Sequence, residues 1–492
     1  MAFEKRVNRR GFLTVAAGGG AAAILAACGN TAPAAPAVGG GGSGSGSSSG
    51  STASTPAKGG AATAAGGVAT APVGGTSATS APAMSSGAAG GAVYILQDKS
   101  TSDAGSLDAT TLYNTANKGA PAIALEDEAT GWEAKVLPQI KDKSLRWSGS
   151  GYIPYFDQYK EIKAGIVAPL DDYLKASKVP WAAKQKDVYF TPRIFDALQL
   201  DGKQYYIPMR IHPHMVGWRV DHLQAAGYDT MPKTWDEVDK MLPKIKTALA
   251  KDQVTPFSIA RDLWRSIGVG ATTFQAEPLD EQGVFKLESP EWITMIEMYK
   301  KWIDGGLARF DTQDDAINLW QKGKFSMSLG SQSWVRLGRQ VFSADKVKGG
   351  TPPQASATMP PRTWCHIDSA CVFVNAPNGQ AATDWALTTY GPEGAPAEAW
   401  WKGTLQVSGA PLYQPMIDKF VKSNQDIAEI NEALSLLPNS HINTVAQAAG
   451  FGVMQLVLPA YLDRYFKGEF SSKDAMAKAR AEINAEFAKQ KA

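Results

Sequence analysis

The segment RIHPHM, residues 210–215, places one arginine and two histidines at alternating positions. Because successive side chains of an extended strand point to opposite faces, Arg210, His212 and His214 are predicted to share one face. Two histidines at this spacing are able to bind Zn²⁺, but the chain's other three histidines are scattered and no acidic, His-rich loop exists. The pattern therefore favours hydrogen bonding or ligand contact, and no metal is predicted.

The segment TWCHIDSAC holds two more reactive side chains, Cys365 and Cys371. In an oxidising compartment a disulfide could close this short loop, and two free buried thiols are the alternative. With His366 the two cysteines would make three metal ligands, but their spacing matches no known metal motif.

Motifs of enzymes are missing from the sequence outside its Gly/Ser-rich run. G-x-S-x-G occurs at residues 46–50, within that run and not between a strand and a helix, so it carries no meaning there. The sequence contains no H-E-x-x-H and no phosphate-cradling glycine loop between a strand and a helix. The carboxylates Asp171 and Asp172 stand at a predicted helix start, where they favour the helix dipole. A glycosidase would need two carboxylates across one cleft, which the sequence leaves open. We predict a protein that is not an enzyme and needs no cofactor.

Strand and helix patterns alternate along the chain. GAVYIL and KQYYIPM are predicted strands, the second entered through the turn Asp201–Gly202. Helices are predicted after Thr234, which begins a capping box with Glu237, after Ser289, and after Ser471 or Ser472. Trp235, Trp292 and Trp302 lie in these helices and are assigned to packing. Alternating strands and helices indicate an α/β architecture.

The N-terminus has the features of an export signal. Arg9-Arg10 precedes a short apolar run that is too rich in glycine for a stable membrane span, and the run ends in Leu25-Ala26-Ala27-Cys28. The first part resembles a twin-arginine signal, and the second resembles a lipobox, in which Cys28 carries lipid. We predict a signal peptide over 1–27, and a disordered tether of Gly, Ala, Ser, Thr and Pro over 28–91, about 45 Å in mean reach.

The remaining 400 or so residues are too many for one hydrophobic core, so two lobes are expected. Removal of residues 1–27 changes the formal charge from +2 to −1. A nearly neutral chain without basic clusters argues against a nucleic-acid partner.

Four stretches occur in an order that is typical of one family: YIPYFDQYKEIKAGIVAPLDDYLK, LDGKQYYIPMRIHPHMVGWRVDHLQAAGYDTMPKTWDEV, NLWQKGKFSMSLGSQSW and YLDRYFKGEFSSKDAMAKARAEIN. Together they resemble the family 1 extracellular solute-binding proteins of bacteria, the carbohydrate-type receptors of ABC importers related to maltodextrin-binding protein. The resemblance spans residues 92 to 492. One departure is Trp218-Arg219, where the family often has Tyr-Asn.

The resemblance implies two α/β lobes that close on a solute about hinge strands. Residues 92–211 and 372–409 are expected to form the first lobe, and 212–371 and 410–492 the second. The crossings are expected in RIHPHM, HIDSACVF and VSGAPLY.

The resemblance also implies where ligand binds. Aromatic planes stack on the C–H faces of a sugar, while amides, carboxylates and arginines bind its hydroxyls. Trp147 lies in RWSGSGY, expected to be a loop at the position of family ligand contacts, and Trp334 matches the family's aromatic after GSQS. His212 falls at a polar hinge position. The expected ligand contacts are Trp147, Tyr152, Arg210, His212, Arg261, Asp262, Trp264, Trp334, Trp364 and His366, with core packing as the alternative for each tryptophan.

This resemblance implies a lipid-anchored receptor that captures a small solute and delivers it to an ABC importer permease. The favoured solute is a sugar or oligosaccharide. The alternatives are a surface lectin or carbohydrate-active enzyme without a transporter, and a receptor for a polyol, a phosphorylated glycerol, an oligopeptide or a metal.

Overall fold

The computed structural model describes residues 91–98, 104–128, 131–279, 285–405, 409–422, 424 and 427–491. The predicted signal peptide, Cys28 and nearly all of the predicted tether lie outside these residues.

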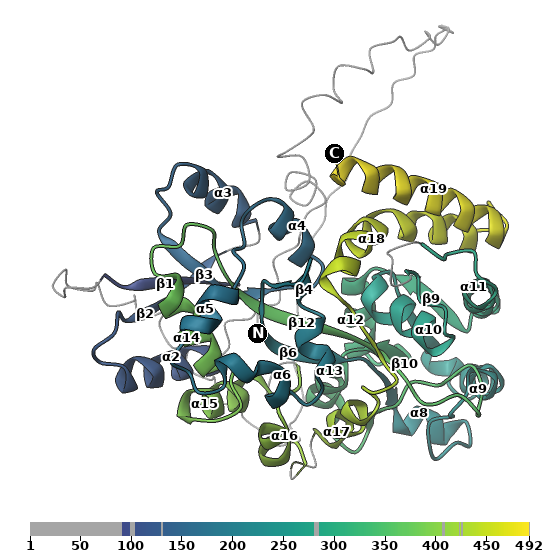
Figure 1. Cartoon of the computed structure of the whole chain (residues 1–492). Helices are drawn as coiled ribbons and strands as arrows, with labels where there is room; N and C mark the ends of the chain where they lie inside the picture. The colour runs from purple at the N-terminus through teal and green to yellow at the C-terminus, as the bar shows by residue number, and fades with distance from the viewer. Residues whose placement is uncertain are drawn as a thin grey trace, which may run out of the picture. The chain divides into compact units, whose positions relative to one another are not determined.

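A first sheet has the strand order β13-β12-β3-β1-β2, with β6 also paired to β12 (Figure 1). β3 is parallel to β1, whereas β12 is antiparallel to both β3 and β6. Around this sheet lies a core that includes Trp385, Trp400 and Trp401, and we call this part the first lobe. Its strands are β1 (Val93–Asp98), β2 (Ile123–Glu128), β3 (Trp147–Ile153), β6 (Ile207–Pro213), β12 (Trp364–Val372) and β13 (His441–Ile442).

The helices of the first lobe are short. They are α2 (Ala104–Ala116), α3 (Glu133–Lys141), α4 (Gln158–Lys163), α5 (Asp171–Ala176), η1 (Ala182–Lys184), α6 (Gln185–Val188), α7 (Arg193–Asp196), α14 (Gly379–Thr389), α15 (Ala395–Thr404) and α16 (Gln414–Phe420). A two-stranded hairpin of β4 (Gln199–Leu200) and β5 (Lys203–Gln204) adjoins them, and its turn is Asp201–Gly202, as predicted.

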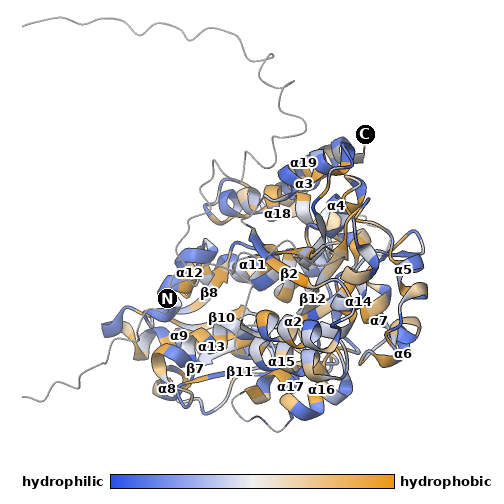
Figure 2. Cartoon of the chain, turned by 90° about the vertical axis from the view of Figure 1, so that its left-hand side faces the viewer, coloured by the Kyte–Doolittle hydropathy of each residue, from blue (hydrophilic) through white to orange (hydrophobic). Residues whose placement is uncertain are grey.

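A second sheet has the order β11-β7-β10-β8-β9, and with its two cores it forms the second lobe. Among its helices, α9 and α12 carry hydrophilic residues at the periphery and hydrophobic ones toward the interior (Figure 2), whereas α10 is buried throughout. The strands are β7 (Met215–Arg219), β8 (Thr255–Ala260), β9 (Ala308–Asp311), β10 (Phe325–Gly330) and β11 (Val347–Gly350). The helices are α8 (Val220–Ala225), α9 (Trp235–Ala248), η2 (Ala250–Asp252), η3 (Leu263–Ile267), α10 (Gly268–Thr273), α11 (Pro290–Asp304), α12 (Gln313–Gln321), α13 (Gln332–Phe342), α18 (Val445–Phe466) and α19 (Ser472–Lys491), and α17 (Ala428–Ser435) lies between the lobes' cores.

The predicted helix starts are confirmed. Thr234 and Glu237 form a reciprocal capping box before α9, the Ser289 hydroxyl accepts from the Trp292 backbone N–H, and Ser471 accepts from that of Asp474. The helical tryptophans Trp235, Trp292 and Trp302 are fully buried, which confirms their assignment to packing.

The chain passes between the lobes at places that differ in part from those expected. It leaves β6 and enters β7 at His214, within RIHPHM. The second passage is the segment 351–363, because β12 lies wholly in the first sheet, so HIDSACVF is not a crossing. Residues around Ala410 and Leu412 pack in the first lobe, so the expected boundary at 409/410 was wrong. The third passage follows β13, where α18 enters the core of the second lobe.

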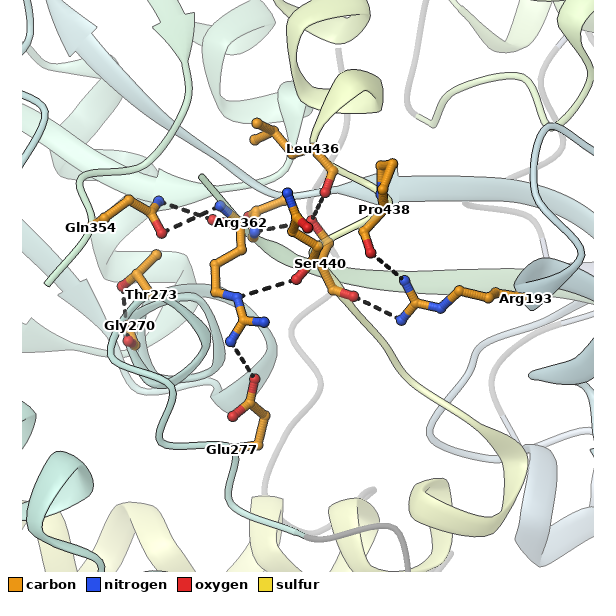
Figure 3. Close-up of polar contacts among 11 residues, drawn as sticks. Arg193, Gly270, Thr273, Glu277, Gln354, Arg362, Leu436, Pro438 and Ser440 are labelled. Carbon is orange, nitrogen blue, oxygen red and sulfur yellow. Dashed lines mark hydrogen bonds and ion pairs between the residues drawn. The ribbon is translucent and has the colours of Figure 1, made fainter. Parts of the chain in front are cut away.

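The loop between α17 and β13 is held from both lobes (Figure 3). Arg193, from the first lobe, donates to the backbone carbonyls of Leu437, Pro438 and Ser440. Arg362 donates to the Asn439 carbonyl and pairs with Glu277 of the second lobe at 3.5 Å. Two arginines therefore fasten one loop to both lobes beside the third passage.

Helix α18 is long and apolar enough to cross a membrane by length and composition. It packs in the second lobe, where Phe451, Met454 and Leu458 are buried. A core helix of a folded domain has the same composition, so this one helix is weak grounds for a membrane span.

Cys365 and Cys371 are free thiols, and both are buried. Both lie in the single strand β12, and six residues of extended chain hold their Cα atoms about 20 Å apart, well beyond the reach of a disulfide. The disulfide alternative was therefore wrong, because TWCHIDSAC is a strand and not a closed loop.

Candidate ligand-binding site

Paired strands β6 and β12 bring four charged or polar side chains together between the lobes. The antiparallel register sets His212 opposite His366 and Arg210 opposite Asp368. Because alternate residues share a face, all four side chains converge on one side of this strand pair. Asp368 Oδ2 accepts from Arg210 Nε at 3.1 Å and lies 2.8 Å from His212 Nε2, and all these side chains are buried.

The charge state of this cluster follows from its burial. Burial acts to raise the pKa of Asp368, but His212 and the Arg210 guanidinium outweigh it and hold that pKa well below its usual range. Burial lowers the pKa of His212 despite the carboxylate beside it. The imidazole is therefore neutral at pH 7, and we assign the stabilisation of Asp368 to the Arg210 charge and to the His212 N–H bond.

Four aromatic rings surround His366, and the nearest, that of His212, is stacked on it with ring centres 4.4 Å apart. The Nδ1 of His366 lies 3.1 Å from His214 Nε2, and the His366 ring lies 4.8 Å from that of Tyr155 and 5.7 Å, edge-on, from that of Trp264. His214 is the residue at which the chain passes between the sheets, and Trp264 belongs to the second lobe. Through these contacts the cluster extends from strands β6 and β12 of the first lobe to Trp264 of the second lobe.

In the second lobe, the residues that adjoin the cluster belong to the short π-helix η3. Asp262 caps it by accepting from the backbone N–H of Arg265 at 3.0 Å, and its other oxygen accepts from Arg265 Nη1 at 2.6 Å. The guanidinium lies 3.8 Å from the centre of the Trp264 ring and 5.9 Å from that of Trp334. A buried arginine thus lies against one indole ring and near a second.

Several buried polar atoms at this junction have no hydrogen-bond partner among the described residues. Leaving such atoms unpaired costs about 1–3 kcal/mol each, so native proteins seldom do so without a reason. Hydroxyl or carbonyl groups of a bound molecule would satisfy them. The atoms are Tyr155 Oη, His214 Nδ1, Arg265 Nε and Trp334 Nε1.

Two of the expected contacts lie elsewhere than predicted. RWSGSGY is strand β3 and not a loop, and Trp147 is buried in the first core with its Nε1 donating to Glu126 at 2.7 Å. The glycines serve packing, because a Cβ on Gly149 would fall 2.1 Å from the Cys371 carbonyl oxygen. Arg261 pairs with Asp463 on α18, at 2.8 Å.

Other expected contacts lie at the edge of the cluster or within it. The Tyr152 ring is 5.7 Å from the Arg210 guanidinium, so this tyrosine lies at the edge of the cluster. Trp364 is buried against His441 and Phe451, with ring centres 4.3 and 4.8 Å away. The structure brings together Arg210, His212, Asp262, Trp264 and His366. Trp334 lies near Arg265 but is fully buried in a core of the second lobe. Two surface hollows, of about 410 and 490 Å³, lie on the second lobe and contain none of the expected contacts.

Sequence reasoning missed Asp368, Arg265 and Tyr155. Two of them had a signal: Asp368 follows His366 by two residues in an extended strand, and Arg265 directly follows Trp264. Tyr155 reaches the cluster only through the packing of distant segments.

A family model described as bacterial extracellular solute-binding protein matches residues 109–426. The chain belongs to this family. The expected family and the two-lobed fold are confirmed, and as an extracellular solute-binding protein the chain is exported. A binding protein of Brucella abortus (strain 2308) is 24% identical over 316 residues, which are 58% of this chain and 72% of the relative.

Solved structures of two other binding proteins share the fold of this solute-binding protein. The sugar-binding protein MalE of Xanthomonas citri superposes with a TM-score of 0.64 at 15% identity, covering 82% of this chain and 98% of that one. UgpB of Mycobacterium tuberculosis, solved with glycerophosphocholine, superposes with a TM-score of 0.65 at 14% identity, covering 81% and 99%. At these identities the likeness concerns the fold alone.

Proposed function

We propose that this solute-binding protein captures a sugar or oligosaccharide between its lobes and delivers it to an ABC importer permease. The observation that carries the proposal is the partly buried Trp264, which lies against the buried Arg265 guanidinium and beside several unpaired buried polar atoms. Indole faces suit the C–H faces of a sugar ring, and the polar atoms suit its hydroxyls. The sugar-binding protein MalE, which shares the fold, supports this choice.

The charge balance of the cluster favours a neutral solute. Arg210 is paired with Asp368, and Arg265 with Asp262, all of them buried. Each arginine is thus already compensated, and no surplus positive charge awaits an anion. A neutral polyhydroxyl compound is therefore the first candidate. A phosphodiester, such as the glycerophosphocholine bound by UgpB, is the second.

Capture is coupled to the arrangement of the lobes. The candidate site has side chains from β6 and β12 in the first lobe and from η3 in the second. A solute that contacts residues of both lobes therefore binds best when the lobes are closed. A ligand shifts such an equilibrium only by its difference in affinity for the two forms. Closure on the solute would then present the form that the permease recognises.

A panel of solutes tests the proposal directly. We expect an oligosaccharide or monosaccharide at 100 times its Kd to stabilise the protein by about 2.7 kcal/mol, seen as a raised melting temperature. Polyols, glycerophosphodiesters and short peptides serve as the competing classes. A shift with glycerophosphocholine alone would replace the sugar by a phosphodiester, and no shift with any sugar would contradict the proposal.

The proposed anchor rests on the N-terminal sequence, which lies outside the described residues. The twin arginines and the Leu-Ala-Ala-Cys motif support export in a form that is lipidated at Cys28. We expect Cys28→Ala to release the protein from the membrane fraction without changing its melting temperature, because the modified residue is far along the chain from the globular part. Membrane fractionation of wild type and variant measures this, and a variant that still pellets fully would exclude the lipid anchor.

A further inference from the structure

A hollow of about 490 Å³ opens on the second lobe, at the end of the sheet opposite the candidate ligand-binding site. Its lining comes from the end of β7, from α8 and from the segments just before β8 and β10, whereas η3 follows the other end of β8. Among the described lining residues, Arg219, Lys251, Lys322 and Lys324 are cationic, and Asp252 is the one carboxylate. The hollow is therefore electropositive.

Arg219 is fixed in this lining with one nitrogen left over. Its Nε and Nη2 donate to the two carboxylate oxygens of Asp221 at 2.9 and 2.7 Å, and its guanidinium lies 3.8 Å from the centre of the Phe342 ring. The third nitrogen, Nη1, makes no hydrogen bond to the described residues and lies at Gly323, where an added Cβ would come within 3.1 Å of it. Because Gly323 lines the hollow, these N–H groups are available there.

His222 adds a second donor that has no partner. Its Nδ1 is 3.0 Å from the hydroxyl of Ser326, which is fully buried in β10 and has no other hydrogen-bond partner among the described residues. The hydroxyl proton must therefore be donated to Nδ1. Burial and the Arg219 charge lower the pKa of His222 to about 4, so the ring is neutral at pH 7 and its one proton is on Nε2. The side chain is only 8% exposed, and this N–H is directed away from Ser326, on the side of the hollow that His222 lines.

We propose that this hollow binds a phosphate group, either of a small soluble molecule or of a lipid headgroup. The Arg219 and His222 N–H groups and three lysine ammonium groups donate from different elements, and a tetrahedral phosphate accepts on all sides, whereas a carboxylate has only two oxygens. The Asp221 carboxylate neutralises Arg219, so the surplus charge that attracts the phosphate comes from the lysines. A hollow of this size also has room for the group that carries the phosphate.

The charges around the hollow give a test by sign. The Asp252 side chain opposes an anion, so Asp252→Asn should tighten phosphate binding about two- to threefold at low salt. Lys251 and Lys322 have no ion-pair partner among the described residues, and the change of either to Gln should weaken binding by about the same factor. Added NaCl should reduce all these differences. Residues that only stabilised the fold would not change phosphate affinity in opposite directions according to their charge.

The experiment uses the full chain with Cys28→Ala, which cannot be lipidated at that residue, and titrates it with inorganic phosphate in a calorimeter. We expect one phosphate per chain at this hollow. His222→Asn keeps an amide near the position of Nδ1 and loses the donor at Nε2, so it should weaken binding about tenfold. His222→Gln is the matched control, because its longer side chain returns an N–H near Nε2, and it should stay within about threefold of wild type. Lys244→Gln, at the other hollow of this lobe, should change nothing.

A second arm separates the two sources of phosphate. Co-sedimentation with phosphatidylglycerol vesicles that is lost in His222→Asn, in a chain that does not bind inorganic phosphate, assigns the group to a lipid headgroup. Binding of inorganic phosphate with the same loss assigns it to a soluble molecule. A wild-type chain that binds neither probe would overturn the proposal, and so would equal affinities in wild type, His222→Asn and Lys251→Gln.

The inference does not rest on sugar capture, since the hollow and the candidate ligand-binding site lie at opposite ends of the second sheet. Trp264→Ala should leave phosphate binding at the hollow unchanged. Phosphate binding that is lost in Trp264→Ala but kept in His222→Asn would place the anion at the candidate ligand-binding site and overturn the assignment to the hollow.

Discussion

Asp368→Ala is expected to lower the free energy of unfolding by about 3–5 kcal/mol, because it leaves the buried Arg210 guanidinium without a counter-charge. The same change removes the hydrogen-bond partner of His212. Water does not reach this cluster to compensate for either loss, since the side chains of all three residues are nearly inaccessible. Denaturant unfolding at constant pH measures the effect.

Asp304→Ala is the matched control for this loss. Asp304 pairs with Lys300 four residues earlier, but its side chain is 56% exposed. Exposed pairs of this type contribute about 0.3–0.5 kcal/mol. Similar losses in the two variants would contradict the assignment of Asp368 as a buried charge centre.

Trp264→Ala and Trp292→Ala are expected to have opposite effects. Trp292 is fully buried in the second core and donates from Nε1 to the sulfur of Met476, so its loss should cost about 3–5 kcal/mol of stability. Trp264 is only partly buried and lies against Arg265 and His366. Its loss should cost about 1–3 kcal/mol of solute affinity and less stability, as truncation of an aromatic anchor commonly does.

Both quantities must be measured for both variants, with the solute that gives the largest shift in the panel. Trp147→Ala extends the comparison, because the structure places Trp147 in the first core, and we expect it to behave as Trp292→Ala does. A Trp264→Ala variant that melts early but binds normally would move Trp264 from the site to the core.

Local features of the sequence determined the parts of the fold that depend on a few neighbouring residues. Thr234 and Glu237 cap the same helix end, three residues apart, and Ser289 bonds to a backbone N–H three residues on. The spacing of apolar residues in the helix after Ser289 predicted that Trp292 is buried, because residues three or four apart share one face of a helix. The common face of Arg210 and His212 followed from strand geometry alone, and both side chains meet at Asp368.

The family, too, was evident from the sequence, because the order of its stretches survives where the identity to solved relatives is only about 15%. The pattern of strands and helices fixed the α/β class. It did not fix where each strand pairs, since a β-ladder joins residues that are far apart in the chain.

The tertiary structure alone decided the site. The glycines of RWSGSGY indicated a loop, yet they form a central strand, because Gly149 lets β3 approach the backbone of β12. TWCHIDSAC suggested a closed loop, yet pairing with β6 extends it and separates its cysteines. That same pairing sets Asp368 opposite Arg210, and the packing of η3 brings Arg265 to Trp334. Side chains distant in sequence meet only when strand register and lobe packing are fixed, and no local pattern encodes that register.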